Sequence, residues 1–319
     1  MRDTDASRRT LARMPRLLAL LLVAVGALLA GITAARDEAP APAKPFKLLA
    51  DGGRLKAPAG AKRPVLGLAF GGGGVRGFMH LGVIKALEEG GLRAPVVTGT
   101  SAGAIAAVLY GSGAPYAKIA QAVLELREWD LADLTFNRNG FVKGEALAEW
   151  VARQAGADDL AKLAARVGIT AVDIGAQKTV LITGGDPGLA AQASASIPGV
   201  FIPVHNDGRT YIDGGVLDQV PVRFAKALGA DVVVGVDIYC GRALTADEGS
   251  MRTAYNVFRL QSCTLNLPNE RAADVLIQPE FAMPRGGRLE MRDAAIEAGY
   301  RAARAKLPEI RRALAQASR

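Results

Sequence analysis

The chain has 319 residues, of which 50% are hydrophobic and 22% charged, so it is long and apolar enough to bury a sizeable core. An aromatic content of 5% argues against a stacking platform for nucleic acid, and two cysteines and two histidines argue against disulfide scaffolds and zinc modules. The net charge of +8 lies at the two ends of the chain, since the 25 basic and 25 acidic residues of 36–284 cancel. We therefore expect no nucleic-acid partner.

The N-terminus has the pattern of an export segment. Four clustered arginines precede an uncharged apolar run from Leu17 to Ala35, and small residues end that run. The pair Arg8-Arg9 resembles a twin-arginine signal. A run of this length also suffices to span a bilayer, so residues 1–35 are either a cleaved signal peptide or a retained anchor. Both interpretations predict that the rest of the chain lies outside the cytoplasm, in the periplasm or cell envelope.

The next segment, residues 36–64, is rich in alanine and proline. Repeated prolines disfavour helix and remove backbone donors, which predicts an extended linker. We expect the globular domain at 65–319, with a motif-bearing core at 66–226 and a helical part at 249–319.

A glycine-rich loop follows the first predicted strand, residues 65–70. Its sequence is Gly71-Gly72-Gly73-Gly74-Val75-Arg76-Gly77, and a helix is predicted at 78–89. A loop between a strand and a helix N-terminus presents backbone amides to negative charge. The glycines match the dinucleotide fingerprint, but no acidic residue ends the next strand and no Gly-Lys-Ser/Thr follows. Neither nucleotide site is expected, and the loop alone fits a tight turn equally well.

The second motif, Gly99-Thr100-Ser101-Ala102-Gly103, has the form G-x-S-x-G. It lies between a predicted strand at 95–98 and a predicted helix at 102–109. A serine at such a sharp turn, beside a helix N-terminus, is typical of a nucleophile.

A nucleophilic serine needs a base. The α/β-hydrolases place a histidine after the acid, and no histidine follows His205 in this chain. His205 could serve only with an acid between it and Ser101, and no motif supports Asp130, Asp173 or Asp186 in that role. Asp213-Gly214-Gly215 ends a predicted strand, and its glycines allow close approach to a serine. Asp213 is therefore the better candidate.

These motifs together resemble the patatin-like phospholipases in order and spacing. The G-G-G-x-R-G loop at 72–77, G-x-S-x-G at 99–103 and Asp-Gly-Gly at 213–215 carry the resemblance, and residues 193–204 resemble the block before the family's aspartate. The resemblance implies an α/β patatin-like three-layer fold with a mostly parallel central sheet flanked by helices. It also implies hydrolysis of lipid acyl esters by a Ser–Asp dyad, with no metal or other cofactor. Residues 169–183 lack a clear counterpart to the family's usual strand and turn.

The motif residues are expected to play distinct roles. Ser101 attacks the ester carbonyl, Asp213 accepts its proton, and the backbone N–H groups of Gly72, Gly73 and Gly74 form the oxyanion hole. The remaining motif residues are expected to support this geometry: Arg76, Gly77, Gly99, Gly103, Gly214 and Gly215.

Further elements complete the chain. Helices are predicted at 116–127, 144–155, 251–263 and 292–306, and a strand at 231–238. The last helix is basic and amphipathic, which suits either contact with an anionic membrane surface or a solvated face. Cys240 and Cys263 are either paired or free.

Two functions remain open at this point. The first is a lipid acyl hydrolase of phospholipase A, lysophospholipase or carboxylesterase type. The second is a non-catalytic envelope protein that uses the same fold to bind lipid or a partner.

Overall fold

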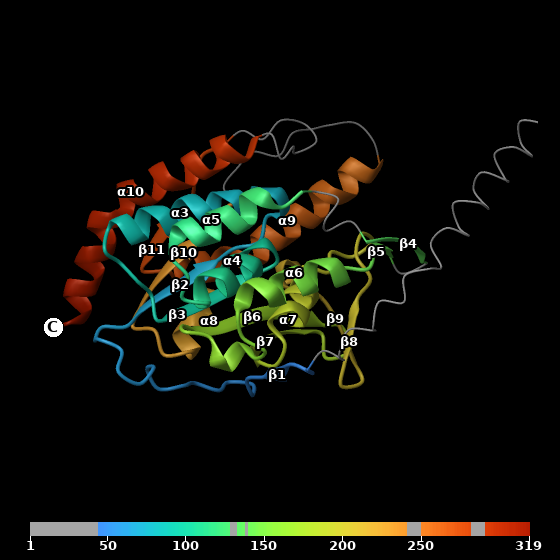
Figure 1. The fold of residues 1–319 in the computed structure, drawn as a ribbon, viewed down its shortest axis with the longest axis horizontal. Helices are drawn as coiled ribbons and strands as arrows, with labels where there is room; N and C mark the ends of the chain where they lie inside the picture. The colour runs from blue at the N-terminus through green and yellow to red at the C-terminus, as the bar shows by residue number, and fades with distance from the viewer. Residues whose placement is uncertain (1–43, 128–132, 138–139, 241–249, 282–290) are drawn as a thin grey trace, which may run out of the picture. The chain divides into compact units, whose positions relative to one another are not determined.

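The computed structural model describes residues 44–127, 133–137, 140–240, 250–281 and 291–319 (Figure 1). The predicted export segment at 1–35 lies outside these ranges. Within them, a nine-stranded sheet has the order β1-β7-β6-β3-β2-β10-β11, with β9 paired to β6 and β8 paired to β9. The strands are β1 (Lys47–Leu48), β2 (Leu66–Phe70), β3 (Val96–Thr100), β6 (Arg166–Asp173), β7 (Lys178–Gly184), β8 (Val204–Asn206), β9 (Arg209–Asp213), β10 (Val232–Val236) and β11 (Val275–Ile277). A separate hairpin joins β4 (Leu134–Asn137) to β5 (Gly140–Val142).

The centre of the sheet is parallel, as predicted. Strands β11, β10, β2, β3 and β6 run in one direction, whereas β7 and β9 run antiparallel to β6. Apolar residues dominate β2, β3 and β10, and every residue of these strands is buried, because helices cover both faces of the sheet. The carboxyl ends of β2 and β3 therefore meet at one edge, where open α/β sheets bind ligands.

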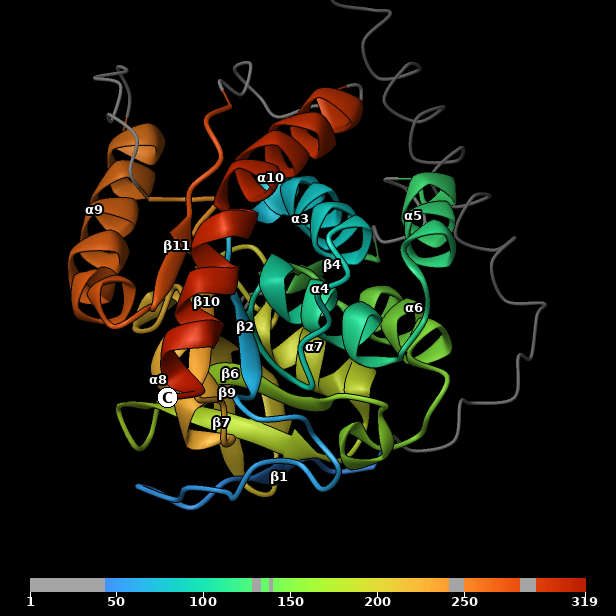
Figure 2. The same ribbon diagram turned by 90° about the vertical axis from the view of Figure 1, so that its left-hand side faces the viewer.

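Two apolar cores lie on the two faces of the sheet. Leu66, Leu68 and Phe70 of β2 belong to the larger core, whereas Ala69 belongs to the smaller one. Helices α3, α4 and α10 cover the face of the larger core, while α8 and α9 lie on the opposite side (Figure 2). The helices are α3 (Phe78–Glu89), α4 (Ala102–Gly111), α5 (Tyr116–Glu125), α6 (Glu145–Ala155), α7 (Pro187–Ser194), α8 (Val222–Ala227), α9 (Ser250–Arg271) and α10 (Arg292–Ala317), with 3-10 turns η1 (Gly74–Gly77), η3 (Leu160–Lys162) and η4 (Gly214–Val216). No helix in the described ranges combines the length and apolar character needed to cross a bilayer.

Helix α10 packs closely on α3 through two glycines. A Cβ atom at Gly82 would lie 1.9 Å from the carbonyl oxygen of Ile296, and one at Gly299 would lie 2.0 Å from that of Met79. The apolar side of α10, including Leu307 and Ile310, is buried in the larger core. The apolar side of the helix is therefore packed inside the domain, and contact of its basic side with a membrane stays a prediction.

Three expectations about the domain are corrected. The predicted linker at 36–64 is wrong at residues 46–48, because β1 pairs with β7 and Phe46 is buried against Tyr211. Residues 169–183 do form a strand and turn: β6 and β7 make an antiparallel hairpin, and the Asp173 carboxylate accepts the N–H of Ala176 in the turn. The helical part at 249–319 also contains a strand, since β11 adds to the sheet beside β10. The strands β1 and β11 are short and depend on partners distant in sequence. By contrast, β6 and β7 follow one another in the chain and pair with each other.

The contact between α3 and α10 predicts a specific sensitivity. We expect Gly299→Ala to lower the free energy of unfolding by about 1–3 kcal/mol, because the new methyl group meets backbone atoms that cannot move aside independently. Ala305→Ser, which adds one atom at an exposed position of the same helix, should change it by less than about 0.5 kcal/mol. Thermal or urea unfolding of the two variants measures the difference, and equal stabilities would contradict the close packing.

Candidate active site

The glycine loop after β2 is held at its start by backbone hydrogen bonds. The Gly71 N–H donates to the Val236 carbonyl at 2.9 Å, and the Gly72 N–H donates to the Gln219 carbonyl at 3.0 Å. Because its N–H is already used, Gly72 cannot donate to an oxyanion in this conformation, and that part of the prediction is wrong. Within the described residues no hydrogen bond is recorded from the N–H of Gly73 or Gly74, so these two remain the candidate oxyanion donors.

Ser101 occupies a strained turn between β3 and α4. Its backbone has φ 54° and ψ −122°, a left-handed φ that non-glycine residues rarely adopt. The turn requires glycine on both sides: a Cβ at Gly99 would lie 2.2 Å from the Gly103 carbonyl oxygen, and one at Gly103 would lie 2.1 Å from the Phe70 carbonyl oxygen. This close approach brings Ser101 to the end of β2, beside the glycine loop.

Asp213 ends strand β9 and lies next to Ser101. It is paired with Ala171 of β6, and only 4% of the residue is exposed. Its carboxylate accepts the N–H of Gly215 at 2.7 Å and the hydroxyl of Ser101. The structure thus brings together the two residues that the sequence assigned as nucleophile and base.

Burial sets the protonation of Asp213. Desolvation raises the pKa of its carboxyl to about 6, while the hydrogen bonds from Ser101 and Gly215 act in the opposite direction. The aspartate is therefore ionised at neutral pH, yet it is more basic than an aspartate in water. Both properties suit a proton acceptor.

The segment around the end of α7 forms hydrogen bonds with the backbone of both Ser101 and Asp213. The Ser194 hydroxyl oxygen accepts the N–H of Ser101 at 2.8 Å, and the Ser196 carbonyl accepts the N–H of Asp213 at 3.0 Å. These two residues lie in the block 193–204 that resembles the family, but its sequence does not show which atoms they touch.

A cavity of about 400 Å³ extends from Ser101 and is lined mainly by apolar side chains. Its volume is in the range of small-molecule sites. The side chains around it come from the helices on one face of the sheet and from the segment after α7; they include Ile105, Leu109, Leu126, Trp150, Ile197 and Phe201. The arrangement suits an apolar group placed beside a nucleophile.

Neither histidine is placed to act as the base. His205 is exposed on β8, where its Nδ1 pairs with the Thr210 hydroxyl at 3.1 Å. His80 borders the cavity but is fully buried, and its Nε2–H donates to the Gly71 carbonyl at 2.8 Å. Burial lowers the pKa of His80 to about 4, so it is neutral at physiological pH and helps to hold the glycine loop.

The remaining motif residues shape the loops around the site. A Cβ at Gly214 would lie 2.6 Å from the Thr170 carbonyl oxygen, one at Gly215 3.0 Å from Asp213 Oδ1, and one at Gly77 3.1 Å from the Ala102 Cβ. The guanidinium of Arg76 lies over the Tyr239 ring, 5.7 Å from its centroid, and its supporting role stays a prediction.

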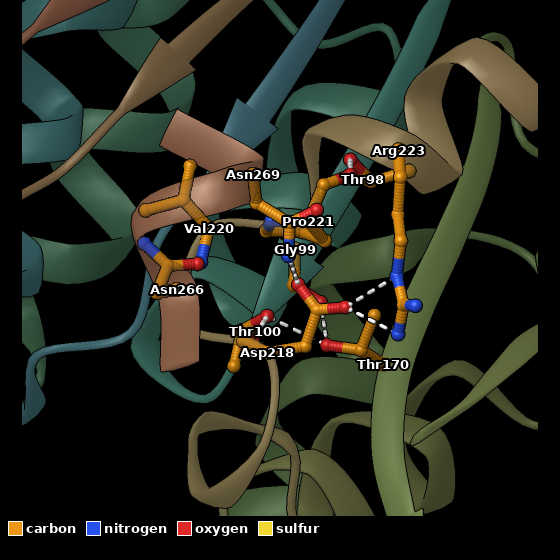
Figure 3. Close-up of polar contacts among 10 residues, drawn as sticks. All are labelled: Thr98, Gly99, Thr100, Thr170, Asp218, Val220, Pro221, Arg223, Asn266 and Asn269. Atoms are coloured by element: carbon orange, nitrogen blue, oxygen red, sulfur yellow. Dashed lines mark hydrogen bonds and ion pairs between the residues drawn. The ribbon is translucent and has the colours of Figure 1, made fainter. Parts of the chain in front are cut away.

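A polar network behind the site joins three segments (Figure 3). The Thr100 and Thr170 hydroxyls are 2.6 Å apart, and the Thr100 hydroxyl donates to the Asp218 carbonyl at 2.9 Å. The buried Asp218 carboxylate pairs with Arg223 at 2.8 Å and accepts a hydrogen bond from Asn269 at 2.9 Å. Thr100 precedes Ser101, and Thr170 precedes the β6 residue that pairs with Asp213. The network therefore couples the two ends of the dyad.

One cluster has the composition of a metal site but not its chemistry. The possible ligand atoms of Asp237, Cys240 and Glu270 all lie within 4.8 Å of one another. The Cys240 sulfur, however, forms a disulfide with Cys263, and the Asp237 carboxylate already accepts three hydrogen bonds, from the N–H groups of Tyr239 and Cys240 and from Gln278. These residues are accordingly committed to the structure, and the question of whether the two cysteines pair is answered.

Comparison with known proteins assigns the family. Residues 68–226, about half of the chain, match the model of the patatin-like phospholipases, and the chain belongs to this family. The crystal structure of VipD from Legionella pneumophila shares the fold, with a TM-score of 0.50 and 15% identity over 88% of this chain and 72% of that chain.

Curated relatives are similar to a little over half of the chain. An uncharacterised NTE family protein of Mycobacterium tuberculosis is 32% identical over 181 residues, which are 56% of this chain and 50% of the relative. A lysophospholipase of Chaetomium globosum is 29% identical over 179 residues, which are 54% of this chain and 12% of that protein. The chain thus spans half or less of the length of these relatives.

The raised pKa of Asp213 predicts an acid limit on the reactivity of Ser101. The rate of Ser101 labelling by a fluorophosphonate probe should be half-maximal near pH 6. Below pH 6 the rate should fall about tenfold for each unit by which the pH is lowered, because the ionised fraction of Asp213 decreases. Burial raises this pKa, so the stability contributed by Asp213 is fully present at low pH and is lost as the pH rises through 6. Protonation of this group therefore does not cause unfolding.

A pH profile of the labelling rate tests this prediction. The control is Asp51→Asn, which removes an exposed carboxyl outside the site and should keep the acid limit. A labelling rate that stays constant from pH 7 to pH 4.5 would contradict the assignment of Asp213.

Proposed function

We propose that the protein is a lipid acyl hydrolase of phospholipase A, lysophospholipase or carboxylesterase type. The proposal rests on one observation above all: the Ser101 hydroxyl donates to a buried Asp213 carboxylate beside an apolar cavity. Membership of the patatin-like phospholipase family supports it, as does similarity to fungal proteins named lysophospholipases. An apolar cavity suits the acyl chain of a lipid ester, and the proposed reaction requires no metal.

The first half of the proposed reaction forms an acyl-enzyme. Ser101 Oγ attacks the ester carbonyl carbon while its proton passes to Asp213. The N–H groups of Gly73 and Gly74 hold the resulting oxyanion, and one such donor typically contributes about 10²–10³ in rate. Asp213 then returns the proton to the leaving alcohol as the carbon–oxygen bond of the ester breaks.

The second half releases the fatty acid. Water attacks the acyl-enzyme carbonyl, Asp213 takes a proton from that water, and the tetrahedral intermediate collapses with Ser101 as leaving group. Asp213 returns the proton to Ser101 Oγ. Since the same carboxylate acts in both halves, its pKa near 6 allows it to accept and donate in turn.

A labelling experiment tests the proposal directly. We expect a fluorophosphonate probe to label the wild-type protein and not Ser101→Ala, and lysophospholipid hydrolysis to be lost in Ser101→Ala. Asp213→Asn, which has nearly the same shape but cannot accept the proton, should lower the rate by at least about 10²-fold. Thermal unfolding of each variant controls for loss of fold. A properly folded wild-type protein with no Ser101-dependent label would favour a lipid-binding protein without catalysis.

We also propose that the protein is exported to the cell envelope. The basic and apolar pattern of residues 1–35 supports this, and so does the Cys240–Cys263 disulfide, since such bonds persist outside the reducing cytoplasm.

A fusion of residues 1–64 to a reporter active only outside the cytoplasm should be active, and replacement of Arg8 and Arg9 by lysine should reduce export if the twin-arginine route is used. An inactive wild-type fusion, produced at normal level, would refute export.

A further inference from the structure

The loop at residues 214–221 connects both halves of the proposed site. At its start, the Gly215 N–H donates to the Asp213 carboxylate at 2.7 Å. Further along, the Gln219 carbonyl accepts the Gly72 N–H, and the Asp218 carbonyl accepts the Thr100 hydroxyl. The position of this loop therefore determines the distance between the base, the nucleophile turn and the glycine loop.

Helix α9 holds this loop from outside through a row of polar side chains. The Ser262 hydroxyl donates to the Gly215 carbonyl, Asn266 Oδ1 accepts the Val220 N–H at 2.8 Å, and Asn269 Nδ2 donates to the Asp218 carboxylate at 2.9 Å. These three residues are spaced at i, i+4 and i+7, which places them on one side of the helix. Figure 3 shows Asn266 and Asn269 directed at Val220 and Asp218.

The usual polarity of a surface helix is reversed in α9. Ser262 and Asn266 are at most 1% exposed, whereas Val257, Leu260 and Leu267 on the other side are 44–55% exposed. Among the described residues of α9, none belongs to either apolar core. Apolar burial, the usual force that holds a helix to a domain, is therefore weak here.

A covalent bond and an arginine supplement the polar row. Cys263, next to Ser262, is bonded to Cys240, which follows β10. One turn earlier, the buried Arg259 donates to the Tyr239 carbonyl through Nη2 at 2.9 Å. Both contacts attach α9 to the segment that follows β10. The last residue of β10, Val236, accepts the Gly71 N–H at the start of the glycine loop.

We propose that Ser262 and Asn266 are positioning residues of the proposed hydrolase, and that the Cys240–Cys263 disulfide keeps them in place. They act on the loop at 214–221 and, through it, on Asp213 and the glycine loop; they do not contact the reacting atoms. The inference rests on the proposed function. It assigns a role in that function to a helix outside residues 68–226, the part that matches the family.

Removal of a positioning contact has two expected effects. Without the Ser262 hydroxyl, the Gly215 carbonyl loses its donor and the loop gains freedom, so Asp213 is less well aligned with Ser101. A looser loop also admits water to Asp213, which reduces the desolvation that raises its pKa. A slower reaction and a shifted pH dependence should therefore occur together.

The first test compares a variant on the buried side of α9 with one on its exposed side. Ser262→Ala should label with a fluorophosphonate probe roughly tenfold more slowly than wild type, with the acid limit moved to lower pH. Thr264→Ala removes a hydroxyl on the exposed side of the helix and should label at the wild-type rate with the wild-type profile. A purely structural role of Ser262 would lower the melting temperature without moving the acid limit.

The second test reduces the native disulfide of the wild-type protein, and a double cysteine variant is its control. Dithiothreitol breaks the sulfur–sulfur bond, giving two thiols while the reagent becomes its cyclic disulfide. Below the melting temperature, reduction should slow Ser101 labelling of the wild type several-fold. It should not affect the Cys240→Ser/Cys263→Ser double variant, which should already be slow.

The outcomes separate this inference from the proposed function. If the wild type shows no Ser101-dependent labelling, the proposed function fails. If the wild type labels, but Ser262→Ala and the reduced protein keep its rate and pH profile, the proposed function stands and the positioning role is overturned.

Discussion

The buried hydrogen bond between Ser101 and Asp213 is the interaction around which the rest of the structure is organised. Its two ends come from segments more than 100 residues apart, at the ends of β3 and β9. Taking a carboxylate out of water is costly unless donors surround it. Here the Gly215 N–H and the Ser101 hydroxyl provide them, so the pKa of Asp213 rises only to about 6. Burial and hydrogen bonding together leave the group ionised but basic.

Backbone geometry is as important as charge at this site. The turn at Ser101 brings α4 so close to β2 that no side chain fits at Gly99 or Gly103. Rigid neighbours keep a serine in this unfavourable conformation: β3 before it, α4 after it, and the Ser194 hydroxyl bound to its N–H. In the part of the chain that the structure describes, the N–H groups of Gly73 and Gly74 make no hydrogen bond to another segment.

The polar network next to Ser101 and Asp213 connects three segments of the fold. Thr100, Thr170 and Asp218 are polar, yet all three are completely buried, where apolar residues are usual. Their hydrogen bonds join β3, β6 and the loop after Asp213. A displacement of one segment therefore strains the hydrogen bonds to the other two. Helix α9 extends this network to the surface, which explains why its buried side is polar.

The sequence alone determined the family and the parallel α/β sheet, and it predicted that Ser101 and Asp213 lie together. Those features depend on local patterns: buried strands, glycines at tight turns and a nucleophile at a strand–helix junction. Only the tertiary structure decided that Gly72 uses its N–H within the fold, that the cysteines pair, that residues 47–48 join the sheet and that α9 turns a polar side inward. Each of these depends on contacts between residues far apart in the chain, and local periodicity carries no information about such partners.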